Sequence, residues 1–428
     1  MKIKTLEKNY EEVLALQKEP AFVPKKPNRL FRKIMKLAAG ADLKKVDFSY
    51  DTEGMDKIRK DEPCIILMNH SCFLDLGIAA TVFADRPFNI VCTSDGFVGK
   101  KWLMRQLGCI PTQKFVTDMA LLKHMKYALH TLKSSVLLYP EASYSFDGCA
   151  TPLPESVGKC IKVMGVPVVM VRTYGAFQRD PLYNNLQVRD VKVSATVSCL
   201  MTADDIKAKS VADINAILAE SFSFDNFKWQ QENHVKVNEP FRADFLHRVL
   251  YKCPHCNSEE SMIGKGIHIS CSDCGASYEL TDEGYLNNTG GDTIFNHVPN
   301  WYNWQRENVR QELSSHKYSL DLPVRIGMLV DTKAIYFIGN GTLRHNENGF
   351  VLKSDDGRLE YKQVPKHSYS LYSDYYWYEI GDMICIGDKD TLYYCFPTNE
   401  KNVAAKARIA AEEMYRMSRK QSAIIKDA

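Results

Sequence analysis

The chain has 428 residues, more than one domain usually contains, so two or three folded units are expected. Hydrophobic residues make up 45% of it and charged residues 25%, which excludes a chain that is mainly disordered. The net charge of +3 is too small to indicate an acidic partner for the chain as a whole. No apolar run approaches the roughly 20 residues that cross a bilayer, and Met1 to Lys18 lack the apolar core of a signal peptide.

Residues 1–45 form a basic N-terminal segment, in which the spacing of Leu30, Ile34 and Leu37 predicts an amphipathic helix. Lys33 and Lys36 alternate with these apolar residues and give the helix a cationic face. Such a helix is suited to an anionic membrane interface. The alternative is that it packs on the domain core and keeps its charges in water.

Residues 46–245 alternate short apolar strands with helical patterns, which predicts an α/β domain with a largely parallel or mixed sheet. Helices are expected at Ala120–Leu132 and Pro154–Met164. The expected strands are Cys64–Met68, Phe88–Thr93, Ser135–Tyr139, Val166–Thr173 and Val191–Val197.

A histidine and a carboxylate follow the first of these strands, at His70 and Asp75. Loops beyond the ends of strands are where α/β sheets present their chemistry, and a histidine beside a carboxylate is the usual arrangement of a general base. Positions five apart diverge by roughly 140° on a regular helix. We therefore expect His70 in a loop or first turn, with Asp75 reaching back to it. The alternative is a polar cap at His70 and a surface charge at Asp75.

Three further blocks follow in order: Gly108–Lys114, Tyr139–Ser145 and Gly165–Val171. Together with Asn69–Asp75, they resemble the four blocks of the glycerolipid acyltransferase family, NHxxxxD, GxIFIxR, FPEGTRS and VPVxPV. The first block is complete and the others are degenerate. The best-known member of that family acylates 1-acyl-glycerol 3-phosphate.

The resemblance implies that His70 is the general base and that Asp75 orients it. His70 would take the proton of the acceptor hydroxyl as that oxygen attacks the acyl thioester of acyl-CoA or an acylated carrier protein, and this chemistry needs no cofactor. The resemblance further implies an acyltransferase-like mixed sheet flanked by helices. The substrate-binding positions that it indicates are Asn69, Lys114, Glu141, Ala142, Ser143 and Ser145.

The departures from the family pattern concern the acceptor. Ala142 stands for the glycine of the third block, Tyr144 for its arginine, and Lys114 for the arginine of the second block. Arginine pairs with phosphate through a two-pronged fork that lysine and tyrosine lack. The base pair is intact, so acyl transfer is still expected. A degenerate domain that only binds lipid is the alternative.

Two CxxC pairs, Cys253–Cys256 and Cys271–Cys274, lie in a module over about residues 250–285. Their spacing resembles a zinc ribbon, in which four thiolates hold a structural zinc. The alternatives to zinc are an iron–sulfur cluster, which uses similar ligands, and a redox dithiol. The other nine of the 13 cysteines are scattered, which indicates a reducing, cytoplasmic setting. Nucleic-acid binding, the usual rival for a zinc ribbon, is disfavoured because the module is not strongly basic.

Residues 295–428 are rich in Tyr, Ile and Val and carry the turn signals Asn340-Gly341, Asn348-Gly349 and Asp356-Gly357. A helix is expected from Asn402 to about Arg419. This pattern predicts a β-rich domain closed by a helix, which resembles a pleckstrin-homology-like domain. The tyrosine-rich run Tyr369–Tyr378 suggests no chemistry by itself.

Taken together, the sequence predicts a peripheral-membrane acyltransferase of phospholipid biosynthesis. Its acceptor would be a lysophospholipid such as 1-acyl-sn-glycerol 3-phosphate, its donor acyl-CoA or acyl carrier protein, and its place the cytoplasmic surface of a membrane.

Overall fold

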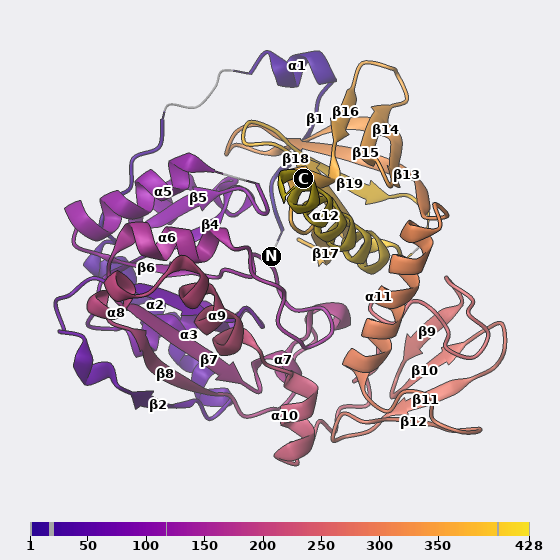
Figure 1. Ribbon diagram of the computed structural model, residues 1–428, viewed down its shortest axis with the longest axis horizontal. Coiled ribbons are helices and arrows are strands. Elements are labelled where there is room, and N and C mark those ends of the chain that lie inside the picture. Colours follow the sequence, from indigo (N-terminus) through magenta and orange to yellow (C-terminus); the bar gives the residue numbers. More distant parts are fainter. Residues whose placement is uncertain (1, 17–20, 117, 400–401, 428) are drawn as a thin grey trace.

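The computed structural model describes residues 2–16, 21–116, 118–399 and 402–427, with side chains as far as residue 419. Figure 1 shows three units: an α/β domain, a small cysteine-bearing sheet, and a larger β-rich domain from which the last helix runs. The predicted order of an α/β domain, a cysteine module and a β-rich region is therefore confirmed.

The α/β domain contains a seven-stranded mixed sheet in the order β2-β8-β7-β3-β6-β4-β5. All neighbouring strands are parallel except β7 and β8, which are antiparallel. The sequence pattern does not predict two of the strands, β2 and β5. Strand β2 is polar and exposed at the sheet edge, and strand β5 contains Pro111. The strands are β2 (Ser49–Glu53), β3 (Ile65–Met68), β4 (Phe88–Thr93), β5 (Cys109–Thr112), β6 (Ser135–Leu138), β7 (Val168–Tyr174) and β8 (Ser194–Met201).

Helices cover both faces of this sheet. On the central strand β3, Ile66 and Met68 pack with α2 and α3, whereas Ile65 and Leu67 pack with α5, α6 and α9 on the other face. This alternation explains why β3 is an unbroken apolar run. The helices of this domain are α2 (Arg29–Lys45), α3 (Leu74–Val82), α4 (Lys101–Gln106), α5 (Met119–Lys126), α6 (Ser156–Met164), α7 (Ala176–Arg179), α8 (Ala203–Ala208), α9 (Val211–Phe222) and α10 (Asn226–Glu232).

The cysteine module is a four-stranded antiparallel sheet in the order β12-β11-β10-β9. The helix α11 (Val298–Ser314) connects it to the C-terminal domain. Trp301 of that helix is fully buried in a core that also takes residues from the α/β domain and from the last helix. The module's strands are β9 (Met262–Lys265), β10 (His268–Cys271), β11 (Ser277–Leu280) and β12 (Leu286–Asn288).

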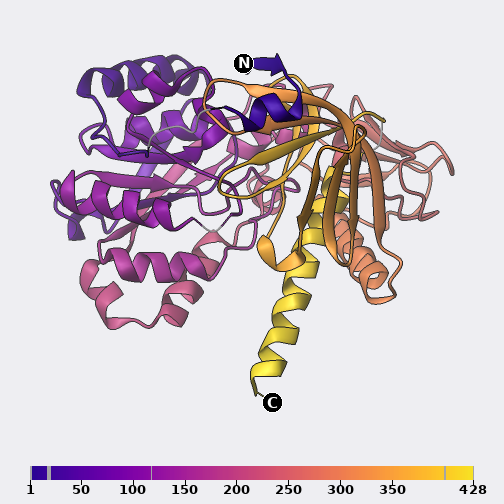
Figure 2. The same ribbon diagram turned by 90° about the horizontal axis from the view of Figure 1, so that it is seen from above.

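The C-terminal domain is a strongly bent antiparallel sheet in the order β16-β15-β14-β13-β19-β18-β17. It is closed by α12 (Ala404–Asp427), whose outer end extends beyond the rest of the molecule in Figure 2. The strands are β13 (Ser319–Leu329), β14 (Ile335–Asn346), β15 (Gly349–Ser354), β16 (Glu360–Gln363), β17 (Tyr372–Trp377), β18 (Gly381–Gly387) and β19 (Leu392–Pro397).

The first described residues of the chain pack on the C-terminal domain. Strand β1 (Thr5–Glu7) pairs parallel with β14, and Val13 of α1 (Tyr10–Leu14) is buried in the core of the C-terminal domain. The later part of residues 1–45, with Phe22 and helix α2, packs on the α/β domain. No helix among the described residues combines the length and the apolarity that crossing a membrane requires.

Candidate active site

His70 lies two residues beyond the end of β3, the central strand of the seven-stranded sheet. Its side chain is 20% exposed and lines a cavity of about 1020 Å³. Loops at the carboxyl ends of parallel strands are free of sheet hydrogen bonds, and they are the usual place of catalytic groups in α/β folds. The central position of β3 therefore fixes where the imidazole is presented.

Asp75 stands in the first turn of α3 and reaches back to His70. Its Oδ2 lies 2.9 Å from Nδ1 of His70 and accepts backbone hydrogen bonds from Ser71 and Cys72 at 2.8 and 3.2 Å. Because a carboxylate only accepts, His70 carries its proton on Nδ1 and leaves the lone pair of Nε2 free. The loop, the helix start and the imidazole are thus held by one carboxylate.

Two tyrosines of the third block enclose the imidazole. The ring of Tyr139 stacks on His70 with 4.2 Å between centroids, and the ring of Tyr144 lies at 4.1 Å. Burial lowers the pKa of His70, and the hydrogen bond and charge of Asp75 oppose that shift. The imidazole is therefore held neutral near neutral pH, in the protonation state that a general base needs.

Glu141 joins the first and third blocks from inside the protein. Its Oε2 accepts the backbone N–H of His70 at 3.1 Å, and its Oε1 accepts that of Thr151 at 2.8 Å. Burial raises the pKa of Glu141 to about 7. Arg408 of α12 donates to the hydroxyl of Thr151 at 3.0 Å, so the last helix supports the same loop.

The other residues of these blocks shape the loops. Oδ1 of Asn69 accepts a hydrogen bond from the backbone N–H of Thr173 at 2.9 Å, and Nδ2 of Asn69 donates to the hydroxyl of Ser71 at 3.0 Å. Ser145 donates to the carbonyl of Cys149 at 2.6 Å. These contacts hold the site loops in place, and the cavity wall does not include Asn69 or Ser145.

Ala142 and Ser143 form the turn after Tyr139. Ala142 lines the cavity and has a φ of 56°, in the left-handed region where an L-residue costs about 1–2 kcal/mol more than glycine. The glycine of the family block would adopt this backbone freely. Ser143 is buried and its hydroxyl donates to the carbonyl of Tyr144 at 3.3 Å.

Lys114 follows β5 and enters the same cavity. Its Nζ lies 3.9 Å from the centroid of the Tyr372 ring, which belongs to strand β17 of the C-terminal domain. Burial lowers the pKa of Lys114, and the charges of Asp374 and Asp95 oppose that shift. The position that the family gives to a phosphate-linked arginine thus meets the C-terminal domain.

The cavity extends from His70 between two walls of different character. One end is apolar and is made by α5, β6 and α6, from which Leu121, Leu122, Met125, Leu138 and Val157 line the wall. The other wall is the C-terminal domain, with an aromatic and acidic surface from Tyr369 to Glu379. An apolar end beside a polar wall suits an amphiphilic ligand.

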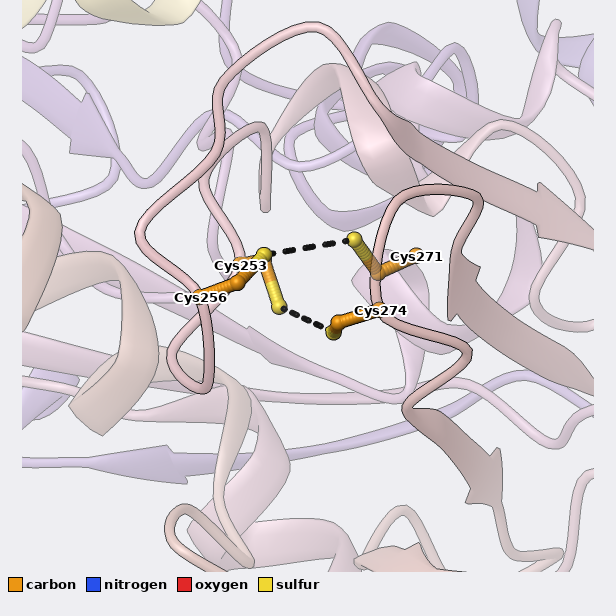
Figure 3. A group of neighbouring side chains, drawn as sticks. All are labelled: Cys253, Cys256, Cys271 and Cys274. Carbon is orange, nitrogen blue, oxygen red and sulfur yellow. Dashed lines mark hydrogen bonds between the residues drawn. The ribbon is translucent and has the colours of Figure 1, made fainter.

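The four predicted metal ligands are gathered in the cysteine module, where Figure 3 shows their side chains converging from two loops. The sulfurs of Cys253, Cys256, Cys271 and Cys274 all lie within 4.8 Å of one another. Two pairs, Cys253 with Cys274 and Cys256 with Cys271, are 3.7 Å apart. Sulfurs bound to one zinc at about 2.3 Å in tetrahedral geometry are separated by about 3.8 Å, so the residues fit a zinc ion held by four thiolates.

His255, which lies between the first two cysteines, takes no part in that cluster. Its Nε2 lies 2.9 Å from the hydroxyl of Tyr278. With four thiolates the coordination shell is closed, which leaves no position for a substrate. The cluster is therefore suited to hold the module together and not to perform catalysis.

The sequence interpretation missed the residues that surround His70 and Lys114. Tyr139 and Tyr144 were visible within the third block, but their stacking on the imidazole has no sequence signature. Tyr372 and Asp374 lie in a tyrosine-rich run to which no chemistry was assigned. Their role depends on the packing of two domains, which periodicity does not encode.

Comparison with known proteins finds similarities to acyltransferases. Residues 49–173, which include all four blocks, match the family model described as Acyltransferase. A chloroplastic 1-acyl-sn-glycerol-3-phosphate acyltransferase of Brassica napus is 25% identical over 133 residues, which are 30% of this chain and 38% of that protein. The crystal structure of the 1-acyl-sn-glycerophosphate acyltransferase PlsC from Thermotoga maritima is 18% identical, with a TM-score of 0.36 over 45% of this chain and 76% of that one.

Proposed function

We propose that the chain moves a fatty acyl group from a thioester donor to the free hydroxyl of a lysophospholipid, a proposal supported by the match of residues 49–173 to the Acyltransferase family model and by the similarity to the Brassica acyltransferase. 1-Acyl-sn-glycerol 3-phosphate, named in the description of the Brassica relative, is one such acceptor. Acyl-CoA and acylated carrier protein both supply the thioester. The product would be a membrane phospholipid or its precursor.

The observation that carries this proposal is the pairing of His70 with Asp75 inside the cavity, at 2.9 Å. Nε2 of His70 takes the proton of the acceptor hydroxyl while that oxygen bonds to the thioester carbonyl carbon. The tetrahedral intermediate then collapses, the carbon–sulfur bond breaks, and the leaving thiolate receives the proton from His70. Asp75 stabilises the imidazolium between these two transfers.

The apolar end of the cavity is suited to the fatty chain. Its lining by α5 and β6 is formed by side chains of one core cluster, including Leu121 and Met125. Each methylene that leaves water for such a wall gains about 0.8 kcal/mol. His70 lines the same cavity, and the ester bond between chain and headgroup would form beside it.

We propose a membrane-facing surface on helix α2 and the neighbouring α4. Leu30, Ile34 and Leu37 recur at helical spacing and are 62%, 49% and 77% exposed, and Trp102 of α4 is 66% exposed. Phe31 links the two helices through a ring contact with Trp102 at 5.4 Å. Exposed apolar side chains among lysines fit an anionic bilayer, where the acceptor lipid resides.

The reaction is tested with purified protein, a radiolabelled acyl-CoA or acyl carrier protein, and a panel of lysophospholipids in mixed vesicles. The expected result is a labelled diacyl lipid that requires the acceptor and is absent with His70→Ala protein purified in the same way. A protein that only binds lipid would yield no labelled product with any pair of substrates. Product formed equally by the His70→Ala protein would refute the assigned base.

A further inference from the structure

Strand β17 of the C-terminal domain builds one wall of the cavity. This wall lies beside Lys114, the position at which the family has a phosphate-linked arginine. Tyr372 lies against the ammonium of Lys114, and Asp374 and Asp95 act on it electrostatically. Tyr372 is itself fixed, because its hydroxyl donates to Asp95 at 2.7 Å and accepts from the indole N–H of Trp377 at 3.0 Å. The wall is therefore preformed.

Lys114 lies beside this wall and Asp374 within it, and both retain hydrogen-bonding capacity. Burial raises the pKa of Asp374 to about 7, against the opposing effect of the Lys114 charge. Among the described residues, no acceptor bonds to Nζ of Lys114, which rests on an aromatic face. Asp374 accepts the backbone N–H of Tyr375 at 2.9 Å through Oδ1, and within the described part of the chain no donor reaches its Oδ2. Both side chains line the cavity. Both side chains are partly exposed there, so an anion at Lys114 and a cation at Asp374 would give each a charged partner.

The balance of charge disfavours a phosphate monoester. Lys114 faces the carboxyl groups of both Asp95 and Asp374, and the third block supplies Tyr144 where the family has an arginine. Arg408 also acts on Lys114, but its guanidinium is paired with Glu412 at 3.3 Å. The two negative charges of a monoester would therefore meet one ammonium and two carboxyl groups. A phosphodiester carries a single negative charge, and a headgroup that ends in an ammonium also supplies the missing positive one.

We propose that the C-terminal domain selects a lysophospholipid acceptor whose phosphodiester headgroup ends in a primary ammonium. The phosphate binds Nζ of Lys114, and the ammonium donates a hydrogen bond to Oδ2 of Asp374. The aromatic rings of β17 add the attraction of cations to π faces. A primary ammonium is specified because Oδ2 is an acceptor and a quaternary ammonium has no N–H. This assignment rests on the proposed function only in taking the cavity as the acceptor site.

The first test compares three lysolipids of one short acyl chain, below their micellar concentration, by calorimetric titration of the wild-type protein without acyl donor. Their headgroups are phosphoethanolamine, phosphoglycerol and the phosphate monoester. The expected result is binding at least tenfold tighter for phosphoethanolamine than for the other two. Equal binding of phosphoglycerol, or tighter binding of the monoester, overturns the proposal.

The second test uses Asp374→Asn, with Asp355→Asn on an exposed turn as the matched control. Asp374→Asn should weaken phosphoethanolamine lysolipid binding about tenfold and strengthen binding of the monoester at least threefold. Asp355→Asn should keep the wild-type preference. A preference unchanged in Asp374→Asn overturns the assignment of the ammonium site.

The same lysolipids are then used as acceptors in the acyl-transfer assay. A tenfold higher kcat/KM for phosphoethanolamine supports both the reaction and its selectivity. Transfer that favours the monoester leaves the proposed reaction intact and refutes the headgroup assignment. Selective binding with no transfer to any acceptor refutes the reaction and supports the headgroup site.

Discussion

The imidazole of His70 is fixed in three directions at the scale of single residues. Oδ2 of Asp75 lies 2.9 Å from Nδ1 of the ring. The rings of Tyr139 and Tyr144 pack on its two faces, with 4.2 and 4.1 Å between centroids. The carboxylate of Glu141 accepts the backbone N–H of His70 at 3.1 Å. In the proposed reaction, a base whose orientation is set before the substrate arrives avoids the cost of ordering it during catalysis. Burial lowers the pKa of His70 and so keeps Nε2 available as a proton acceptor.

Glu141→Gln tests the support beneath His70. Glutamine offers one accepting oxygen where two backbone N–H groups now bond, so one of these would face the amide NH2. We expect the free energy of unfolding to fall by about 1–3 kcal/mol, and kcat to fall at least tenfold because His70 shifts. Denaturant unfolding and steady-state kinetics measure these two effects.

The matched control is Glu220→Gln, on an exposed position of α9. Its unfolding free energy and kcat should equal those of the wild type. Wild-type stability in Glu141→Gln would show that the buried carboxylate does not hold the site loop.

The residue pair at the site is predictable from the sequence, and its surroundings are not. His70 follows an apolar strand, and a spacing of five places Asp75 in a helix start, from which it can reach back. Glu141 was identified as a site residue, but its bonds to the backbone of His70 and Thr151 depend on how two loops meet. The left-handed backbone of Ala142 likewise follows from the turn and not from alanine.

At the scale of elements, apolar runs predicted the buried strands and failed at the sheet edges. The interior strands β3, β4, β6 and β7 start or end within a few residues of the expected positions. Strand β2 is polar and exposed, so no hydrophobic pattern reveals it. The cysteine spacing predicted its cluster because four ligands of one metal leave little freedom in the loops that carry them.

The cysteine module should require zinc for its fold. Its sheet, Trp301 of α11 and residues of α12 share one core, so loss of the metal would loosen all three. We expect one zinc per chain by elemental analysis of the purified protein, and a melting temperature lowered by several degrees in Cys256→Ser/Cys274→Ser. Cys199→Ser, at a half-buried cysteine of β8, should keep both zinc and melting temperature. A zinc-free protein with the same melting temperature as the zinc-bound protein would contradict a structural zinc.

Helix α2 carries the prediction for membrane association. Lys33 and Lys36 are exposed beside the apolar stripe, and each lysine near an anionic surface contributes about 1 kcal/mol. Lys33→Gln/Lys36→Gln should therefore weaken binding to phosphatidylglycerol vesicles roughly 30-fold in a flotation assay. Lys123→Gln/Lys126→Gln, with the same spacing on α5 at the opposite face of the sheet, should bind as the wild type does. Equal binding of the two variants would contradict the proposal that α2 lies at the membrane surface.

At the scale of the whole molecule, the C-terminal domain completes the site that the α/β domain begins. Strand β17 provides one cavity wall, and Arg408 of α12 supports the loop of Thr151 and Glu141. Strand β1 pairs with β14, so the two ends of the chain close on one domain. The sequence predicted the β-rich region and its final helix, but not their contact with the catalytic loops, because side chains so far apart along the chain share no periodic pattern.

The pairing of His70 with Asp75 is tested most directly by the pH dependence of acyl transfer in the wild type and in Asp75→Asn. The carboxylate raises the pKa of His70 against the effect of burial, so its loss should lower that pKa and move the acid limb of kcat/KM to lower pH. The kcat should fall by roughly 100-fold to 10,000-fold, because the imidazolium loses its partner. An Asp75→Asn protein with the kcat and the acid limb of the wild type would contradict the catalytic pairing of His70 with Asp75.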